Sequence, residues 1–129
     1  MGAGATVKPE NARYLALDSA AGIKRLLGDY HALRERRYCG DMTASDLLID
    51  LETAIERADL TDRQRQAIEL VYFRDMKQDD AGRAMGVGRQ RVARHTEIAM
   101  VKIARIYESW ARRGEGYVLT VEEADDGEI

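Results

Sequence analysis

Apolar residues between Leu60 and Tyr107 recur at spacings of three and four, the period of an amphipathic helix. Thr61 stands before this run and Gln64 three residues later, a pair that predicts a capping box and therefore a helix start. The apolar positions that we expect to face a core in this helix are Ala67, Ile68, Val71 and Tyr72. The positions that we expect to stay in solvent are Arg63, Arg65, Gln66 and Glu69.

A second, shorter helix is predicted from about Lys77 to Met85. Gly86 follows it and can adopt the left-handed conformation that closes a helix, after which Val87 is expected to return towards the core. Gly88 is an acceptable cap for a third helix that begins at about residue 89. Two short helices followed by a tight turn and a longer helix predict a helix-turn-helix.

The third helix combines an apolar side with a basic first turn. Its apolar seam consists of Val92, Thr96, Ala99, Ile103, Ile106 and Trp110, and its opposite side of Gln90, Arg94 and Glu97. A helix N-terminus favours phosphate oxygens, arginine can pair bidentately with guanine, and glutamine can pair with adenine. The sequence therefore predicts a DNA recognition helix, although the same charges also fit an ordinary solvated surface helix.

The front half predicts two further helices. The first runs from about Glu10 to Tyr38, where Gly22 and Gly28 indicate a kink, and it ends at Gly40. Its apolar side consists of Ile23, Leu26, Leu27, Tyr30 and Leu33. The second begins with a capping signal formed by Thr43 and Asp46, carries a stripe of Leu47, Leu48, Leu51, Ile55 and Ala58, and ends near Asp59.

These two helices can form a hairpin that covers the helix-turn-helix core. Alternatively they pair between subunits, through the stripe from Ile23 to Leu33 and through Trp110, as in helix-turn-helix homodimers that bind two half-sites. The pattern alone leaves both arrangements open.

Composition agrees with an all-α chain. The 129 residues include a single proline, Pro9, and 45% are hydrophobic, which suffices for one compact unit or two very small ones. The lone cysteine, Cys39, cannot form an internal disulfide, no apolar run is long enough to span a bilayer, and Met1 to Pro9 does not resemble a signal peptide. We therefore expect a cytoplasmic protein without a membrane segment.

The net charge of −3 hides an uneven distribution. Residues 1–60 carry 8 basic and 10 acidic side chains, residues 61–113 carry 12 and 7, and residues 114–129 carry none and 6. The predicted organisation is a helical hairpin over 10–58, a helix-turn-helix domain over 60–113 and an acidic tail over 114–129. Positive charge is concentrated in the helix-turn-helix, where its local field favours a phosphate backbone.

The acidic tail has two interpretations. It is a solubilising terminus, or its acids fold back on residues 89–94 and compete with DNA. Its apolar residues Tyr117, Leu119 and Val121 share one side of an extended segment and can dock on the helices or pair as a strand.

Catalysis and metal binding have little support in the sequence. His31 and His95 are far apart, Cys39 has no partner at a metal-ligand spacing, and no phosphate-binding glycine motif occurs. Adjacent acids such as Asp79 and Asp80 point about 100° apart on a helix. We expect neither an enzyme nor a cofactor, and we expect His95 to contribute to packing more than to base contact.

One ordered set of residues runs through the predicted helix-turn-helix: Leu60-Thr61-Asp62-Arg63-Gln64-Arg65-Gln66, then Tyr72, then Gly86-Val87-Gly88-Arg89 and Val92. With these residues, the segment from Leu60 to Ile106 resembles region 4 of bacterial sigma factors. The whole chain looks most like small sigma-like regulators of phages and prophages. The resemblance implies base contacts by Arg89, Gln90, Ala93 and Arg94 and a backbone contact by Arg91, and Lys77 and Gln78 complete the expected DNA-binding set.

The sequence departs from the family pattern at several positions. Residues 78–81 are Gln-Asp-Asp-Ala where the family usually has an aromatic residue, two acids and a large aliphatic residue. Gly82 replaces a small alanine at a helix-propensity cost of roughly 1 kcal/mol, and Gly88 replaces a serine or threonine cap. Regions 1 to 3 of a sigma factor have no counterpart, so unaided promoter melting is not expected.

Two hypotheses follow. The leading one is a sequence-specific transcription regulator that acts on promoter DNA together with a host RNA polymerase. The other is a DNA-packaging component that resembles a phage small terminase subunit, in which the helical hairpin would build an oligomeric ring. The assembly state separates them, since a ring of eight or more subunits favours packaging.

Overall fold

A computed structural model describes residues 17–113, and these residues form six α-helices and one π-helical turn, with no β-strand among them. The helices are α1 (Ala20–Gly28), α2 (Tyr30–Tyr38), α3 (Met42–Arg57), α4 (Asp62–Ile68), α5 (Gln78–Met85) and α6 (Arg89–Arg113). The π-helical turn Glu69–Phe73 continues α4. The predicted all-α fold is confirmed, whereas the acidic tail and residues 10–16 lie outside the described residues.

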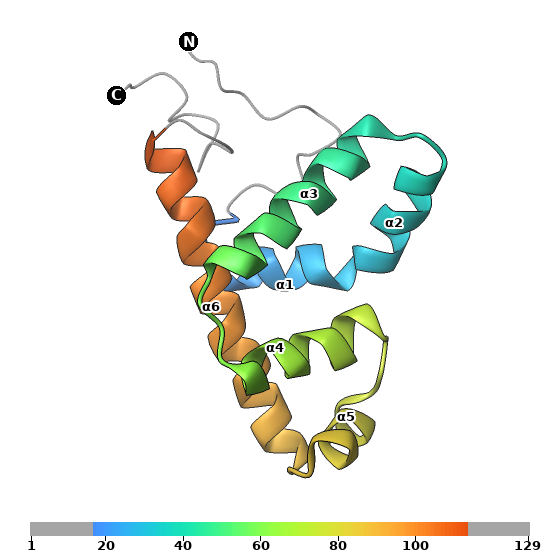
Figure 1. The fold of residues 1–129 in the computed structure, drawn as a ribbon, viewed down its shortest axis with the longest axis vertical. Helices are drawn as coiled ribbons and strands as arrows, with labels where there is room; N and C mark the ends of the chain where they lie inside the picture. Colours follow the sequence, from blue (N-terminus) through green and yellow to red (C-terminus); the bar gives the residue numbers. More distant parts are fainter. Residues whose placement is uncertain (1–16, 114–129) are drawn as a thin grey trace.

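Helix α6 is the axis of the fold (Figure 1). Helices α1 and α3 contact it in its later turns, and α4 and α5 contact it nearer its start. Helices α2 and α3 lie side by side and are joined by a short loop, so the predicted N-terminal hairpin is present as this pair. A single helix thus holds the N-terminal helices and the helix-turn-helix together.

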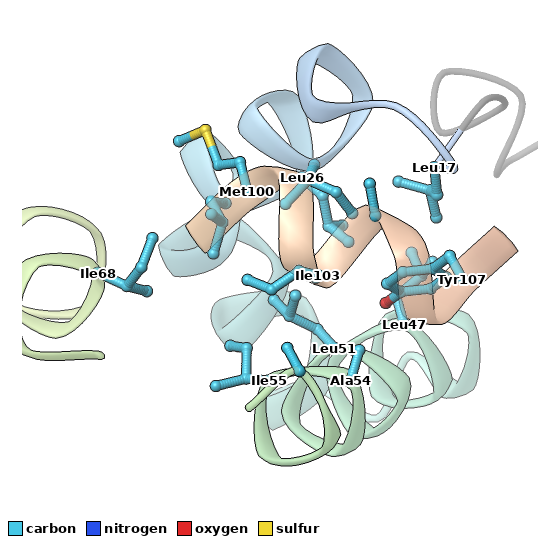
Figure 2. Packing of buried hydrophobic residues seen from close by; sticks show 14 of the residues in the cluster. Leu17, Leu26, Leu47, Leu51, Ala54, Ile55, Ile68, Met100, Ile103 and Tyr107 are labelled. Atoms are coloured by element: carbon cyan, nitrogen blue, oxygen red, sulfur yellow. The ribbon is translucent and has the colours of Figure 1, made fainter. Parts of the chain in front are cut away.

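The larger core lies between α1, α2, α3 and the second half of α6. Figure 2 shows Leu26 of α1, Leu51 of α3 and Ile103 of α6 gathered there, and Ile68 joins the same cluster from α4. All four side chains are buried. The core draws apolar residues from every helix of the described chain except α5, so the front half and α6 share one core.

The apolar stripe of the front half is buried inside a single chain. Ile23, Leu26, Leu27 and Leu33 are at most 1% exposed, and Trp110 is buried with its ring edge against Tyr107. The alternative in which these residues form a dimer seam is therefore wrong for this stripe, because the chain's own helices already cover it.

Two predicted boundaries in the front half are corrected. The single helix expected up to Tyr38 is divided into α1 and α2 at Asp29, whose backbone leaves the helical conformation (φ −95°, ψ 9°). Helix α3 is capped by Asp41, whose carboxylate accepts a hydrogen bond from Ala44 N at 3.1 Å, and not by Thr43. The cap therefore lies two residues upstream of the predicted one.

A smaller core holds the helix-turn-helix together. Its buried members are Ala67 of α4, Ala81 and Met85 of α5, and Val92 of α6, with Leu70, Val71 and Val87 packed against them. The π-helical turn contributes to both cores, since Leu70 and Val71 pack against the smaller one and Phe73 packs against the larger one, where its ring centroid lies 4.4 Å from that of Tyr30 of α2. Burial raises the pKa of the neighbouring Tyr72 hydroxyl. The two cores are separate clusters, but α4, the π-helical turn and α6 contribute side chains to both.

Candidate nucleic-acid interface

The start of the helix-turn-helix is fixed by the predicted capping box. Thr61 accepts a hydrogen bond from Gln64 N, and the Gln64 side chain accepts one from Thr61 N, each at 3.1 Å. Lys102 of α6 donates to the same Gln64 oxygen at 2.9 Å and to Asp59 O at 3.3 Å. The cap therefore also fastens the start of α4 to the recognition helix.

The turn between α5 and α6 is closed as the sequence predicts. Gly86 adopts the left-handed conformation (φ 73°), and Val87 N donates to Gly82 O at 2.9 Å, which satisfies a carbonyl at the end of α5. A Cβ atom placed on Gly82 would lie only 2.7 Å from Val87 O. The glycine at this position, a departure from the family pattern, thus permits the close approach of the turn to α5.

The first turns of α6 are held by residues buried behind them. Val92 is fully buried, and Thr96 is 3% exposed with its hydroxyl donating to Ala93 O at 2.7 Å. Of the predicted apolar seam, Ala99, Ile103 and Trp110 are also buried, and Ile106 is half-buried. The seam prediction is confirmed, and the side of α6 that carries Gln90, Arg94 and Glu97 is exposed.

The residues predicted to contact DNA stand at the starts of α5 and α6, two helices that lie at one end of the molecule (Figure 1). The exposed members are Lys77, Arg89, Gln90, Arg91 and Arg94, and the half-buried ones are Gln78 and Ala93. This end lies away from the α2–α3 loop, so α1, α2 and α3 do not cover it. A duplex could therefore approach the start of α6 without displacing the N-terminal helices.

Ion pairing distinguishes the basic residues of this surface. Arg89 lies 3.8 Å from the Asp79 carboxylate, and Arg83 pairs with Asp80. No carboxylate of the described residues pairs with Arg91 or Arg94. The uncompensated charge thus lies on the exposed and α4-facing sides of α6, while acids partly neutralise the side next to α5.

A hollow of about 570 Å³ lies between α4 and the first half of α6. The side chains around it are Gln64, Gln90, Arg91, Arg94, His95 and Ile98. None of these side chains is acidic, and His95 Nδ1 is buried without a hydrogen-bond partner in the described part of the chain. The hollow is therefore a concave surface with many hydrogen-bond donors beside the predicted recognition face.

Two residues that orient this surface were not identified from the sequence. Arg63, expected only to be solvated, donates from Nη1 to Met85 O at 2.8 Å and so connects α4 to the last turn of α5. Lys102 holds Gln64. The orientation of Lys102 towards α4 could have been found from the sequence. Helical spacings of four and three place it on one side of α6 with Arg91, His95 and Ile98, and this side faces α4.

The remaining candidate groups do not assemble into a chemical centre. His31 and Cys39 are exposed on or after α2, and His95 lies on α6. Within residues 17–113, no group of three or more His, Cys, Asp or Glu side chains is placed to hold a metal ion. No helix of that range is long and apolar enough to cross a membrane.

The tight turn, the buried Val92 and the exposed basic first turn of α6 define a helix-turn-helix of the DNA-binding type. Residues 58–105 match the family model described as Sigma-70, region 4. The chain therefore contains a sigma-70 region 4 domain, as the resemblance from Leu60 to Ile106 indicated. No curated protein and no solved structure matches the chain.

Proposed function

We propose that this protein is a sequence-specific DNA-binding transcription regulator. The observation that carries the proposal is the start of α6, where Gln90, Arg91 and Arg94 are exposed while Val92 behind them is fully buried. An arginine without a carboxylate partner keeps its donors available for a base edge or a phosphate. The sigma-70 region 4 match over residues 58–105 supports the same function.

The mechanism would be one of positioning. Arg89, Gln90 and Arg94 would contact base edges in the major groove, with Ala93 offering a methyl contact. Lys77, Gln78 and Arg91 would contact the phosphate backbone and set the register. Asp79, at 3.8 Å from Arg89, would orient that guanidinium before DNA arrives.

The proposal extends to promoter recognition together with a host RNA polymerase, for a regulator encoded by a phage or prophage and acting in the bacterial cytoplasm, where its DNA target lies. It rests on the region 4 match and on the resemblance of the whole chain to small sigma-like regulators. Helices α1, α2 and α3 would be left free to contact a protein partner, because they lie away from the start of α6. Pull-down of polymerase by the full chain, with and without the selected DNA, would test this step.

The DNA-binding function is tested by selecting bound duplexes from random DNA and measuring affinity for the preferred site. Arg94→Ala should weaken binding to that site by about 1–3 kcal/mol and relax the preference at one base position. Arg112→Ala is the matched control, because Arg112 is exposed at the far end of the same helix. An equal loss on every sequence would make Arg94 a phosphate contact, and the absence of any selected site would reject sequence-specific binding.

Light scattering distinguishes this function from DNA packaging. The packaging hypothesis needs the helical hairpin to build a ring, but the Ile23 to Leu33 stripe is buried within one chain. We expect a monomer, or a homodimer formed through another surface. A ring of eight or more subunits would favour packaging instead.

A further inference from the structure

The hollow beside α6 contains an amide donor whose direction is fixed by its neighbours. Gln64 is 7% exposed, and its Oε1 atom accepts hydrogen bonds from Thr61 N at 3.1 Å and Lys102 Nζ at 2.9 Å. Both neighbours are donors, so only the carbonyl oxygen of the amide can meet them. The amide nitrogen of Gln64 must therefore point away from them, and Gln64 lines the hollow.

The two arginines around the hollow also offer donors. Arg91 and Arg94 are exposed cations without a carboxylate partner among the described residues, whereas His95 Nδ1 is buried from solvent and has no hydrogen-bond partner there. Ile98 supplies the apolar part of the wall. A concave site with two guanidinium groups, an amide nitrogen and no carboxylate favours an anion with several oxygen atoms.

The position of the hollow on the flank of α6 indicates which anion it would bind. A helix is about 10–12 Å across and the major groove is roughly 12 Å wide, so a helix that fills the groove brings a phosphate backbone close to each flank. One flank of α6 faces α5, where Lys77 is available. The opposite flank faces α4 and carries Arg91, His95 and the hollow.

We propose that this hollow is a seat for one backbone phosphodiester of the bound duplex, held by Arg91 and the Gln64 amide beside His95. The proposal rests on the DNA-binding function proposed above and adds α4 to the contact surface. Lys102 is a positioning residue that does not itself contact the phosphate. Its hydrogen bond to the Gln64 oxygen keeps the amide nitrogen of Gln64 directed away from the N-cap of α4. Contacts to a phosphate carry no sequence information, so the seat contributes to affinity and register alone.

Gln64→Glu tests the seat without removing the cap. A glutamate can accept the same bonds from Thr61 N and Lys102 and is a usual partner in a capping box, so thermal unfolding should show no loss of stability. The donor that faces the hollow becomes an anionic oxygen. We expect affinity for the selected duplex to fall by about 10- to 100-fold on preferred and random sequences alike.

Gln66→Glu is the matched control, because it makes the same charge change on α4 but does not line the hollow. We expect it to weaken binding far less than Gln64→Glu. Arg91→Ala should in addition make the fall of log affinity with log salt less steep, by about 0.9 in the magnitude of the slope. Equal effects of the two glutamate variants, or an unchanged salt slope in Arg91→Ala, would overturn the seat and leave the DNA-binding function in place. A wild-type chain that binds no duplex would overturn both.

Discussion

Replacing Gly82 by alanine tests how closely the turn approaches α5, because two opposing effects meet at this position. Alanine improves helix propensity by about 1 kcal/mol over glycine. The new Cβ atom, however, would lie 2.7 Å from Val87 O, a backbone atom that cannot rotate away. Relieving such an overpacked contact costs about 1–3 kcal/mol, and it also strains the 2.9 Å hydrogen bond from Val87 N to Gly82 O. We expect the strain to exceed the gain, with a net loss of up to about 2 kcal/mol.

Gly28→Ala is the matched control for this prediction. Gly28 also lies in a helix, but nothing lies within 4 Å of a Cβ placed there. We expect that variant to gain about 0.4–1 kcal/mol. Chemical and thermal unfolding followed by circular dichroism would measure both variants, where 1 kcal/mol corresponds to about 4–8 °C in a domain of this size. If Gly82→Ala proves as stable as the wild type or more stable while Gly28→Ala gains, the tight contact between the turn and α5 does not limit stability.

Three further predictions concern the caps and the tail. Thr61→Ala should lower the free energy of unfolding by about 1 kcal/mol, and Thr61→Ser should restore it, since serine keeps the hydroxyl that caps α4; equal stability of the two variants would contradict this. Two hydrogen bonds, first the one from Ala44 N and then the one from the Arg36 side chain, lower the pKa of Asp41 below its ordinary 3.8. The ionised carboxylate therefore stabilises the fold above pH 3.8, and this contribution is lost as the pH falls through the lowered pKa of the folded state. Asp41→Asn keeps a good cap and should therefore make the acid-induced loss of stability shallower below about pH 4, as measured by unfolding at several pH values; an unchanged profile would show that Asp41 does not contribute. Deletion of residues 114–129 should tighten DNA binding at low salt if the acidic tail competes for residues 89–94, and unchanged affinity would remove that idea.

Features encoded by a few neighbouring residues were predictable from the sequence. Thr61 with Gln64 and the turn at Gly86 each depend on local hydrogen bonds or on one backbone conformation, and the structure contains both. The division at Asp29 was not predictable, because the apolar positions from Ile23 to Leu33 keep the same period whether the helix is kinked or broken. Tertiary packing decides between the two.

The same distinction applies to the candidate site. The exposed side of α6 followed from helical periodicity, so the positions of Gln90 and Arg94 on it were expected. Which arginines are paired depends on neighbours brought close by the fold, as for Arg89 with Asp79. The bond from Arg63 to Met85 O joins residues 22 positions apart and leaves no local signature. A single sequence therefore indicates the surface but not its network of contacts.

The uninterrupted course of α6 has a consequence for any partner of the N-terminal helices. The helix has 25 residues, a length of about 37 Å, and it carries the basic first turn at one end and the larger core at the other. A partner attached to α1, α2 or α3 would consequently be held at one azimuth around the duplex. If that partner also binds DNA, the two proteins should bind together only when the distance between their DNA sites changes by whole helical repeats, about 10.5 base pairs. An insertion of half a repeat between the two sites should abolish joint binding.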